Sequence, residues 1–180
     1  MSTRKRDILP TNNCFFITTT FRDWLSLLIN DKYYQIIIDS IAFCLVKYKA
    51  DLIVYSLMPN HIHMVLFFGD QPRIPEFMRD LKKYTSTKIR QNLDHDHRSA
   101  LIEKLRFEKG MQRFKVWKER YDAVIIRDQR VLATKINYIH ENSVRKGLVE
   151  NPEDWEFSSA KYYLNGQQGR LPIRNAGEIA

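Results

Sequence analysis

Two histidines, His61 and His63, are the first candidates for chemistry in this sequence. Side chains alternate across a β-strand, so both imidazoles project from one face while Ile62 points to the opposite layer. Two imidazoles on one face can chelate a single metal ion. The pair begins a strand-like run directly after a turn signal at Met58–Asn60, where a rigid scaffold meets solvent. The alternative is that the pair is only the amphipathic surface of an edge strand.

Other histidines are weaker candidates. His95 and His97 repeat the spacing, but they lie in a polar stretch without a strand pattern, which we interpret as a solvated loop. His140 lies about 200° around a predicted helix from Tyr138, at about 100° per residue, and so cannot share its face.

A candidate nucleophile and a third ligand lie on the last predicted helix, from about Asp128 to Asn142. Its core stripe consists of Leu132, Ile136 and Ile139. On the adjacent stripe, Lys135, Tyr138 and Asn142 recur at i, i+3 and i+7, which brings a cation, a phenol and an amide side by side. The alternative for Tyr138 is a tyrosine at the edge of the core with its hydroxyl in water, and spacing alone does not decide between the two.

The chain is basic, with a net charge of +8 and a sequence pI of about 9.5, which favours a polyanionic partner. Cations are dense from Arg98 to Arg120, and Phe107, Phe114 and Trp117 are interleaved among them, a pattern that suits single-stranded nucleic acid. An ordinary solvated loop with inward-facing aromatic rings remains the alternative. The residues predicted to contact DNA are Lys82, Lys83, Arg113, Lys115, Trp117, Lys118, Arg120 and Lys135. We expect one continuous basic surface that leads to the histidines.

Hydrophobic periodicity predicts the elements that must position these residues. In chain order they are a strand at 14–21, a helix at 31–49, a hairpin of strands 51–57 and 61–68, a helix from Ile74, a loop or excursion at 93–115 and the helix at 128–142. This order predicts an α+β fold in which helices stack on an antiparallel sheet.

Length and composition set the frame. With 180 residues and 44% hydrophobic content, we expect a basic tail at 1–12, a single domain at 13–165 and a C-terminal tail at 166–180. No run is apolar enough for a signal peptide or a membrane span. Cys14 and Cys44 are isolated, so we expect reduced core thiols in a cytoplasmic protein.

Taken together, several segments resemble the single-tyrosine HUH transposases, and most closely their REP-associated tyrosine transposase branch. The segments are Ser56–Leu66, Val116–Tyr121, Ile126–Asp128, Asn137–Asn142, Lys146–Val149 and Asp154–Ser159. The resemblance runs from about Phe15 to Tyr163. Two positions depart from the family pattern: Ser143 stands where proline is usual, and Ala123 stands where many relatives have histidine.

The resemblance implies a ferredoxin-like HUH nuclease architecture, with Tyr138 as the nucleophile and Asn142 completing a metal site with His61 and His63. It implies cleavage and rejoining of single-stranded DNA through a 5′-phosphotyrosine intermediate, assisted by Mg²⁺ or Mn²⁺, although the ligand set would also accept Zn²⁺ or Ni²⁺. The expected partner is single-stranded DNA that contains a hairpin. A homodimer is left open, and no membrane partner is expected.

Three other functional classes are alternatives to a transposase. A domesticated hairpin-binding protein that has lost cleavage would keep the basic surface and tolerate loss of the tyrosine or of a histidine, yet all three are present. A metal-dependent hydrolase of the barrel type needs more ligands and a longer chain, typically about 250 residues. A nicking enzyme of plasmid or viral replication shares the chemistry but not the flanking segments.

Overall fold

The computed structural model describes residues 13–69, 71–109 and 112–179. The elements along the chain are β1 (Cys14–Thr20), η2 (Arg22–Trp24), α1 (Asp31–Tyr48), β2 (Ala50–Met58), β3 (His61–Phe68), α2 (Ile74–His95), α3 (Ser99–Leu105), β4 (Arg106–Lys109), β5 (Gln112–Phe114), β6 (Asp122–Ile125), α4 (Gln129–Arg145), η3 (Pro152–Asp154), α5 (Ala160–Asn165) and η4 (Ala176–Ile179). The predicted basic tail at 1–12 lies outside the described residues.

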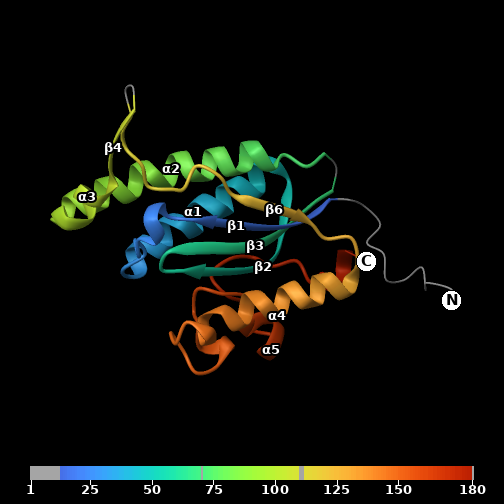
Figure 1. Ribbon diagram of the computed structural model, residues 1–180. Helices are drawn as coiled ribbons and strands as arrows, with labels where there is room; N and C mark the ends of the chain where they lie inside the picture. Colours follow the sequence, from blue (N-terminus) through green and yellow to red (C-terminus); the bar gives the residue numbers. More distant parts are fainter. Residues whose placement is uncertain (1–12, 70, 110–111, 180) are drawn as a thin grey trace.

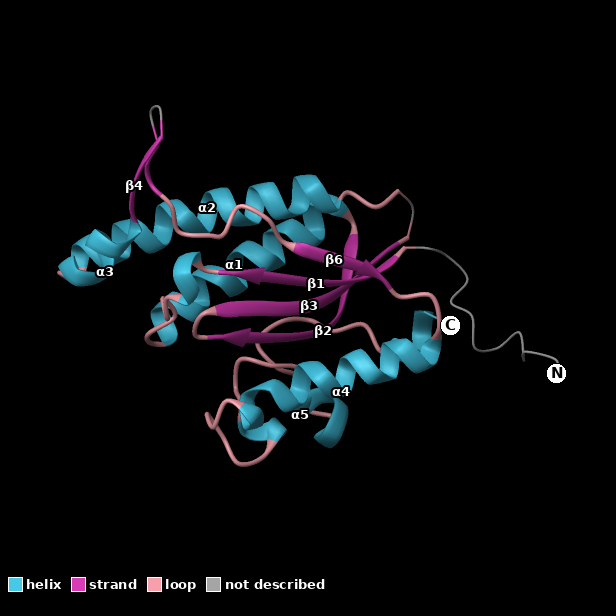
Figure 2. Ribbon diagram, viewed as in Figure 1, coloured by secondary structure: helices cyan, strands magenta, loops and turns pink. Residues whose placement is uncertain are grey.

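One antiparallel sheet, in the order β2-β3-β1-β6, forms the middle layer of the fold. Figures 1 and 2 show α1 and α2 over one face of this sheet and α4 and α5 over the other. The predicted α+β architecture, an antiparallel sheet with flanking helices, is therefore confirmed.

Strand β3 is buried along its whole length because helices cover both of its faces. Ile62 and Met64 pack in the core beneath α1 and α2, whereas Val65 and Phe67 pack in the core beneath α4. Since side chains alternate, the two histidines lie on the α4 side together with Val65. The predicted hairpin is confirmed: β2 and β3 pair directly, and Pro59 and Asn60 form the turn.

Helix α4 matches its predicted start and its predicted core stripe. Its N-cap is Asp128, whose side chain accepts a hydrogen bond of 2.8 Å from the Val131 amide. Leu132 and Ile139 are buried in the core beneath the sheet, and Ile136 packs at its edge. This packing fixes the rotation of α4, so the stripe that carries Tyr138 faces the histidine side of the sheet.

One expectation about the secondary structure was wrong. The 93–115 segment is not a loop, since α2 continues to His95 and is followed by α3 and by the hairpin of β4 and β5, which projects beyond the sheet (Figure 1). Ile89 and Leu93 extend the buried stripe of α2, but the surrounding polar and basic residues hid this periodicity. Within the segment predicted as a C-terminal tail, Leu171 and Ile179 are buried in the two cores. Among the described residues, no helix is both long and apolar enough to cross a membrane.

Candidate metal and nucleophile site

His61 and His63 lie side by side on β3, with ring centroids 4.7 Å apart. Each ring is oriented through its Nδ1 atom: that of His61 lies 2.6 Å from Oδ1 of Asn60, and that of His63 lies 2.8 Å from Oγ1 of Thr18. An amide oxygen only accepts hydrogen bonds, so His61 donates from Nδ1 and keeps a lone pair on Nε2. With Nδ1 engaged in this way, Nε2 is the atom that each ring has free for a ligand.

Burial keeps both imidazoles neutral. Desolvation, with a smaller contribution from Lys146, lowers the pKa of His61 to about 4. Desolvation, with smaller contributions from His61, Arg145 and Lys135, also lowers the pKa of His63 to about 3. Because a metal binds only the neutral imidazole, both side chains are in the ligand form at neutral pH.

Asn142 brings an amide from α4 to the same point. Its side chain is buried, and Nδ2 lies 3.5 Å from Nε2 of His61. Among the described residues no group of three or more histidine, cysteine, aspartate or glutamate side chains could hold a metal. The donor set that this chain offers at the site is therefore two imidazole nitrogens and one amide. Such a set fits a divalent cation and leaves coordination positions for phosphate oxygens.

Tyr138 lies on the α4 stripe beside the histidines. Its ring centroid is 5.5 Å from that of His63 and 6.1 Å from that of Phe16, both in edge-on geometry, and the residue is 41% exposed. The Arg145 guanidinium lies 4.6 Å from the ring centroid and also donates a hydrogen bond of 2.7 Å to the Tyr138 carbonyl. The Lys135 ammonium lies 5.7 Å from the ring. The half-exposed Tyr138 side chain thus adjoins the imidazole of His63 and two cations.

The three histidines that were weaker candidates lie away from this site. His140 is buried on the far side of α4, with Nε2 2.9 Å from Oγ of Ser159, as its angle around the helix predicts. His95 is the last residue of α2, and His97 comes two residues later. Asp96, which lies between them, forms an ion pair with Lys32. His95 and His97 are exposed, but His95 ends a helix and does not lie in a loop as expected.

Most of the residues predicted to contact DNA gather on the α2 side of the molecule. A cleft between α2 and the 114–119 segment is lined by Lys82, Lys83, Lys115, Trp117 and Lys118 among others. Arg113 and Arg120 are exposed beyond it, whereas Lys135 lies across the sheet beside Tyr138. That these cations form one continuous surface stays a prediction.

Two members of that set make contacts within the protein. Trp117 is only 4% exposed: its ring stacks on Phe21 with centroids 4.0 Å apart, and its Nε1 donates to Oγ1 of Thr85 at 3.0 Å. A face covered in this way is not available to a base, so Trp117 is a core residue. Lys82 donates to the carbonyls of Lys118 and Glu119 at 2.9 and 3.3 Å, and burial lowers its pKa to about 8. Lys82 thus holds the 118–120 segment in place.

The sequence alone did not identify several residues that support the site. Thr18 and Asn60 orient the histidines, and Arg145 covers the Tyr138 ring. Asn60 directly precedes His61, and this adjacency was the signal available; Thr18 gives no such signal because it lies 45 residues away along the chain and meets His63 only through strand pairing.

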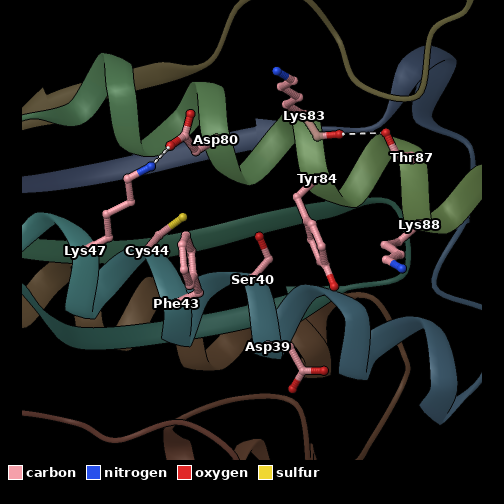
Figure 3. Close-up of a pocket in the computed structure, with 10 residues that line it drawn as sticks. All are labelled: Asp39, Ser40, Phe43, Cys44, Lys47, Asp80, Lys83, Tyr84, Thr87 and Lys88. Atoms are coloured by element: carbon pink, nitrogen blue, oxygen red, sulfur yellow. Dashed lines mark hydrogen bonds and ion pairs between the residues drawn. The ribbon is translucent and has the colours of Figure 1, made fainter.

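A second hollow lies on the face of the sheet opposite the histidines. Figure 3 shows this groove between α1 and α2, where Phe43 and Tyr84 face the gap between the helices. Among the described residues that line this groove, Lys83 is the only one that was predicted as a site residue. The groove is therefore separate from the histidines, which lie on the α4 face.

The family match assigns this chain to a class of DNA-processing enzymes, the transposases. Residues 22–142 match the family described as IS200-like transposase, and the chain belongs to this family. A protein of Haemophilus influenzae that is named as a REP-associated tyrosine transposase is 26% identical over 141 residues, which cover 73% of this chain and 74% of that protein. The resemblance to the tyrosine transposases inferred from the sequence is thus confirmed.

The fold is also found in a solved structure. A REP-associated tyrosine transposase, described as bound to a REP hairpin, superposes with a TM-score of 0.64 at 20% identity, over 97% of this chain and 93% of that one. At this level of identity the similarity concerns the fold, and it supports the antiparallel sheet with flanking helices described above.

Proposed function

We propose that this transposase cleaves and rejoins single-stranded DNA, with Tyr138 as the nucleophile and with His61, His63 and Asn142 holding Mg²⁺ or Mn²⁺. The observation that carries the proposal is the contact of the Tyr138 ring with His63, beside an imidazole pair whose Nδ1 atoms are already engaged. A water-exposed phenol next to two neutral imidazoles and an amide is the arrangement that metal-assisted attack on a phosphodiester requires.

In the proposed step, the phenol oxygen of Tyr138 attacks phosphorus and forms a 5′-phosphotyrosine bond. The bond from phosphorus to the 3′ oxygen breaks, the phenol loses its proton to solvent, and the departing oxygen becomes a 3′-hydroxyl. One phosphoester replaces another of similar energy, so a different 3′-hydroxyl can reverse the step without ATP. When bound, the metal supplies Lewis-acid polarisation of the scissile phosphate.

The side chains around Tyr138 have defined tasks in this scheme. Asn60 and Thr18 keep the two histidine rings turned so that Nε2 is free. Arg145 and Lys135 place positive charge beside the phenol, which favours both an incoming phosphate and a developing phenolate. The buried packing of α4 against the sheet holds Tyr138 and Asn142 in register with β3.

The proposed partner is DNA that combines a hairpin with an unpaired segment. The related structure is described as bound to a REP hairpin, and this chain is basic, with a net charge of +8. Phosphate neutralisation by lysine and arginine gives affinity for any such strand, whereas cleavage needs an unpaired strand that can enter the site.

The test is to incubate the protein with labelled hairpin oligonucleotides that carry single-stranded flanks and with Mg²⁺ or Mn²⁺, and then to look for a covalent adduct on a denaturing gel. The wild-type protein should form an adduct, whereas Tyr138→Phe should bind the same DNA without forming one. Tyr121→Phe is the matched control and should react normally. If wild type binds the hairpin but never forms an adduct, the protein is a non-cleaving hairpin binder and the proposed reaction is wrong.

A further inference from the structure

An exposed tryptophan lies at the edge of the candidate site. Trp24 is 53% exposed, and its ring packs edge-on against His61 with centroids 5.7 Å apart. It comes from the segment between β1 and α1, far along the chain from the histidine pair. A large aromatic ring that is half exposed beside a candidate metal ligand does not contribute to the core, and such exposure is typical of a binding surface.

The backbone holds this ring out under strain. Asp23 and Trp24 both have positive φ angles, 51° and 57°, which L-residues rarely adopt. The surrounding segment is fastened to the β2–β3 turn: the amide of Phe21 donates to the carbonyl of Asn60 at 3.0 Å, and the amide of Leu27 donates to that of Pro59 at 3.0 Å. The turn that orients His61 therefore also fixes the position of Trp24.

A cation lies beside this ring. The Lys118 ammonium lies 4.6 Å from the Trp24 ring centroid, and Lys118 is also part of the cleft beside α2. The charge of Lys146 also acts on the His61 imidazole. An exposed aromatic ring beside a cation is the combination that binds single-stranded nucleic acid, because the cation meets a phosphate while a base stacks on the ring. An apolar protein surface would gain nothing from these charges.

We infer that Trp24, with Lys118, forms a subsite that stacks one unpaired nucleobase next to the scissile phosphate. The inference deepens the proposed function and rests on it, since it names the part of the DNA that adjoins the metal site. Stacking there fixes one nucleotide relative to His61 and so sets which phosphodiester reaches Tyr138. Trp24 is thus a residue that positions the strand, and it is exposed, whereas Trp117, for which the sequence left stacking and burial as alternatives, is buried.

The experiment measures dissociation constants for a labelled hairpin with a single-stranded flank, and for the same hairpin without the flank. Trp24→Ala should weaken binding of the flanked hairpin about tenfold or more, the loss typical of one base stack. Its affinity for the blunt hairpin should stay within about twofold of wild type. Trp24→Phe should recover part of the loss. Phe43→Ala is the matched control, because Phe43 is exposed on α1 on the opposite side of the sheet and should change neither value.

A second measurement replaces each base of the flank in turn by an abasic site. At one position, the abasic site should weaken binding by the wild-type protein as much as Trp24→Ala weakens binding of the intact flank. At that position the abasic site should cause no further loss of affinity in Trp24→Ala. Equal affinity of wild type and Trp24→Ala for the flanked hairpin overturns the inference, as does a loss that is the same on the blunt hairpin. Adduct formation is scored separately. If the flank binds through Trp24 but no adduct forms, the subsite is supported and the proposed cleavage reaction is wrong.

Discussion

Asn60→Ala is the most direct test of how the histidine pair is prepared for a metal. The Asn60 side chain accepts the hydrogen bond from Nδ1 of His61 at 2.6 Å, and alanine removes this acceptor. Loss of such an outer partner typically lowers metal affinity about 10-fold to 100-fold, because the ring gains rotational freedom and the proton can move to the other nitrogen. We expect the Mn²⁺ concentration that gives half-maximal adduct formation to rise by about that factor.

The backbone around Asn60 should survive the change. The contacts that anchor the neighbouring segment run to the carbonyls of Pro59 and Asn60, which alanine retains, and Asn60 is not among the residues with positive φ. Thermal unfolding should therefore shift by only a few degrees. Asn60→Asp keeps an acceptor oxygen and is the matched control, with a half-maximal Mn²⁺ concentration close to that of wild type.

The assay titrates Mn²⁺ against the adduct yield at fixed DNA, and free Mn²⁺ is followed by its electron paramagnetic resonance signal without DNA. Both readouts should move together in Asn60→Ala. The reasoning is refuted if Asn60→Ala binds and uses Mn²⁺ as wild type does while its fold is intact, since the hydrogen bond would then have no part in preparing His61.

Three further outcomes are expected. Trp117→Ala should lower the free energy of unfolding by about 3–5 kcal/mol in urea titrations, because the ring is buried against Phe21; a change under about 1 kcal/mol would contradict the core assignment. Hydrogen bonds from Lys32, and then from His95 and Tyr33, hold the pKa of Asp96 well below its usual range, so its stabilisation is present above pH ~4 and is lost as pH falls towards the folded pKa. Asp96→Asn should therefore flatten the dependence of Tm on pH in acid, and an unchanged profile would count against this pairing. Binding of single-stranded DNA should weaken steeply with salt, by about 0.7 in the logarithmic slope for each phosphate neutralised; an affinity that is flat in salt excludes a phosphate-dominated interface.

The sequence predicted the parts of the fold in which hydrophobic spacing and turn chemistry agree. The β2–β3 hairpin followed from two apolar runs around Pro59 and Asn60, and α4 followed from Asp128 and a regular stripe. The side-by-side position of His61 and His63 needed only strand alternation. Each of these inferences depends on neighbours along the chain, where geometry is nearly fixed.

What the sequence could not predict depends on tertiary contacts. Trp117 lies among cations and suggests a stacking platform, yet pairing between Phe21 and the 117 position turns its ring into the core. Trp24 gives no motif at all, because its role follows from how one connection is tied to a distant turn. Leu171 and Ile179 are sparse apolar residues in a polar segment, so their burial also escapes local pattern analysis.

Placing Tyr138 and Asn142 on one rigid helix has a consequence for control of this protein. The two residues are one turn apart on α4, whereas both histidines belong to the sheet. Any shift of α4 along the sheet would withdraw the phenol and the amide in a single movement, so half-assembled states with one but not the other are not readily reached. A small molecule or a protein that inserts between α4 and the sheet would therefore displace both residues at once.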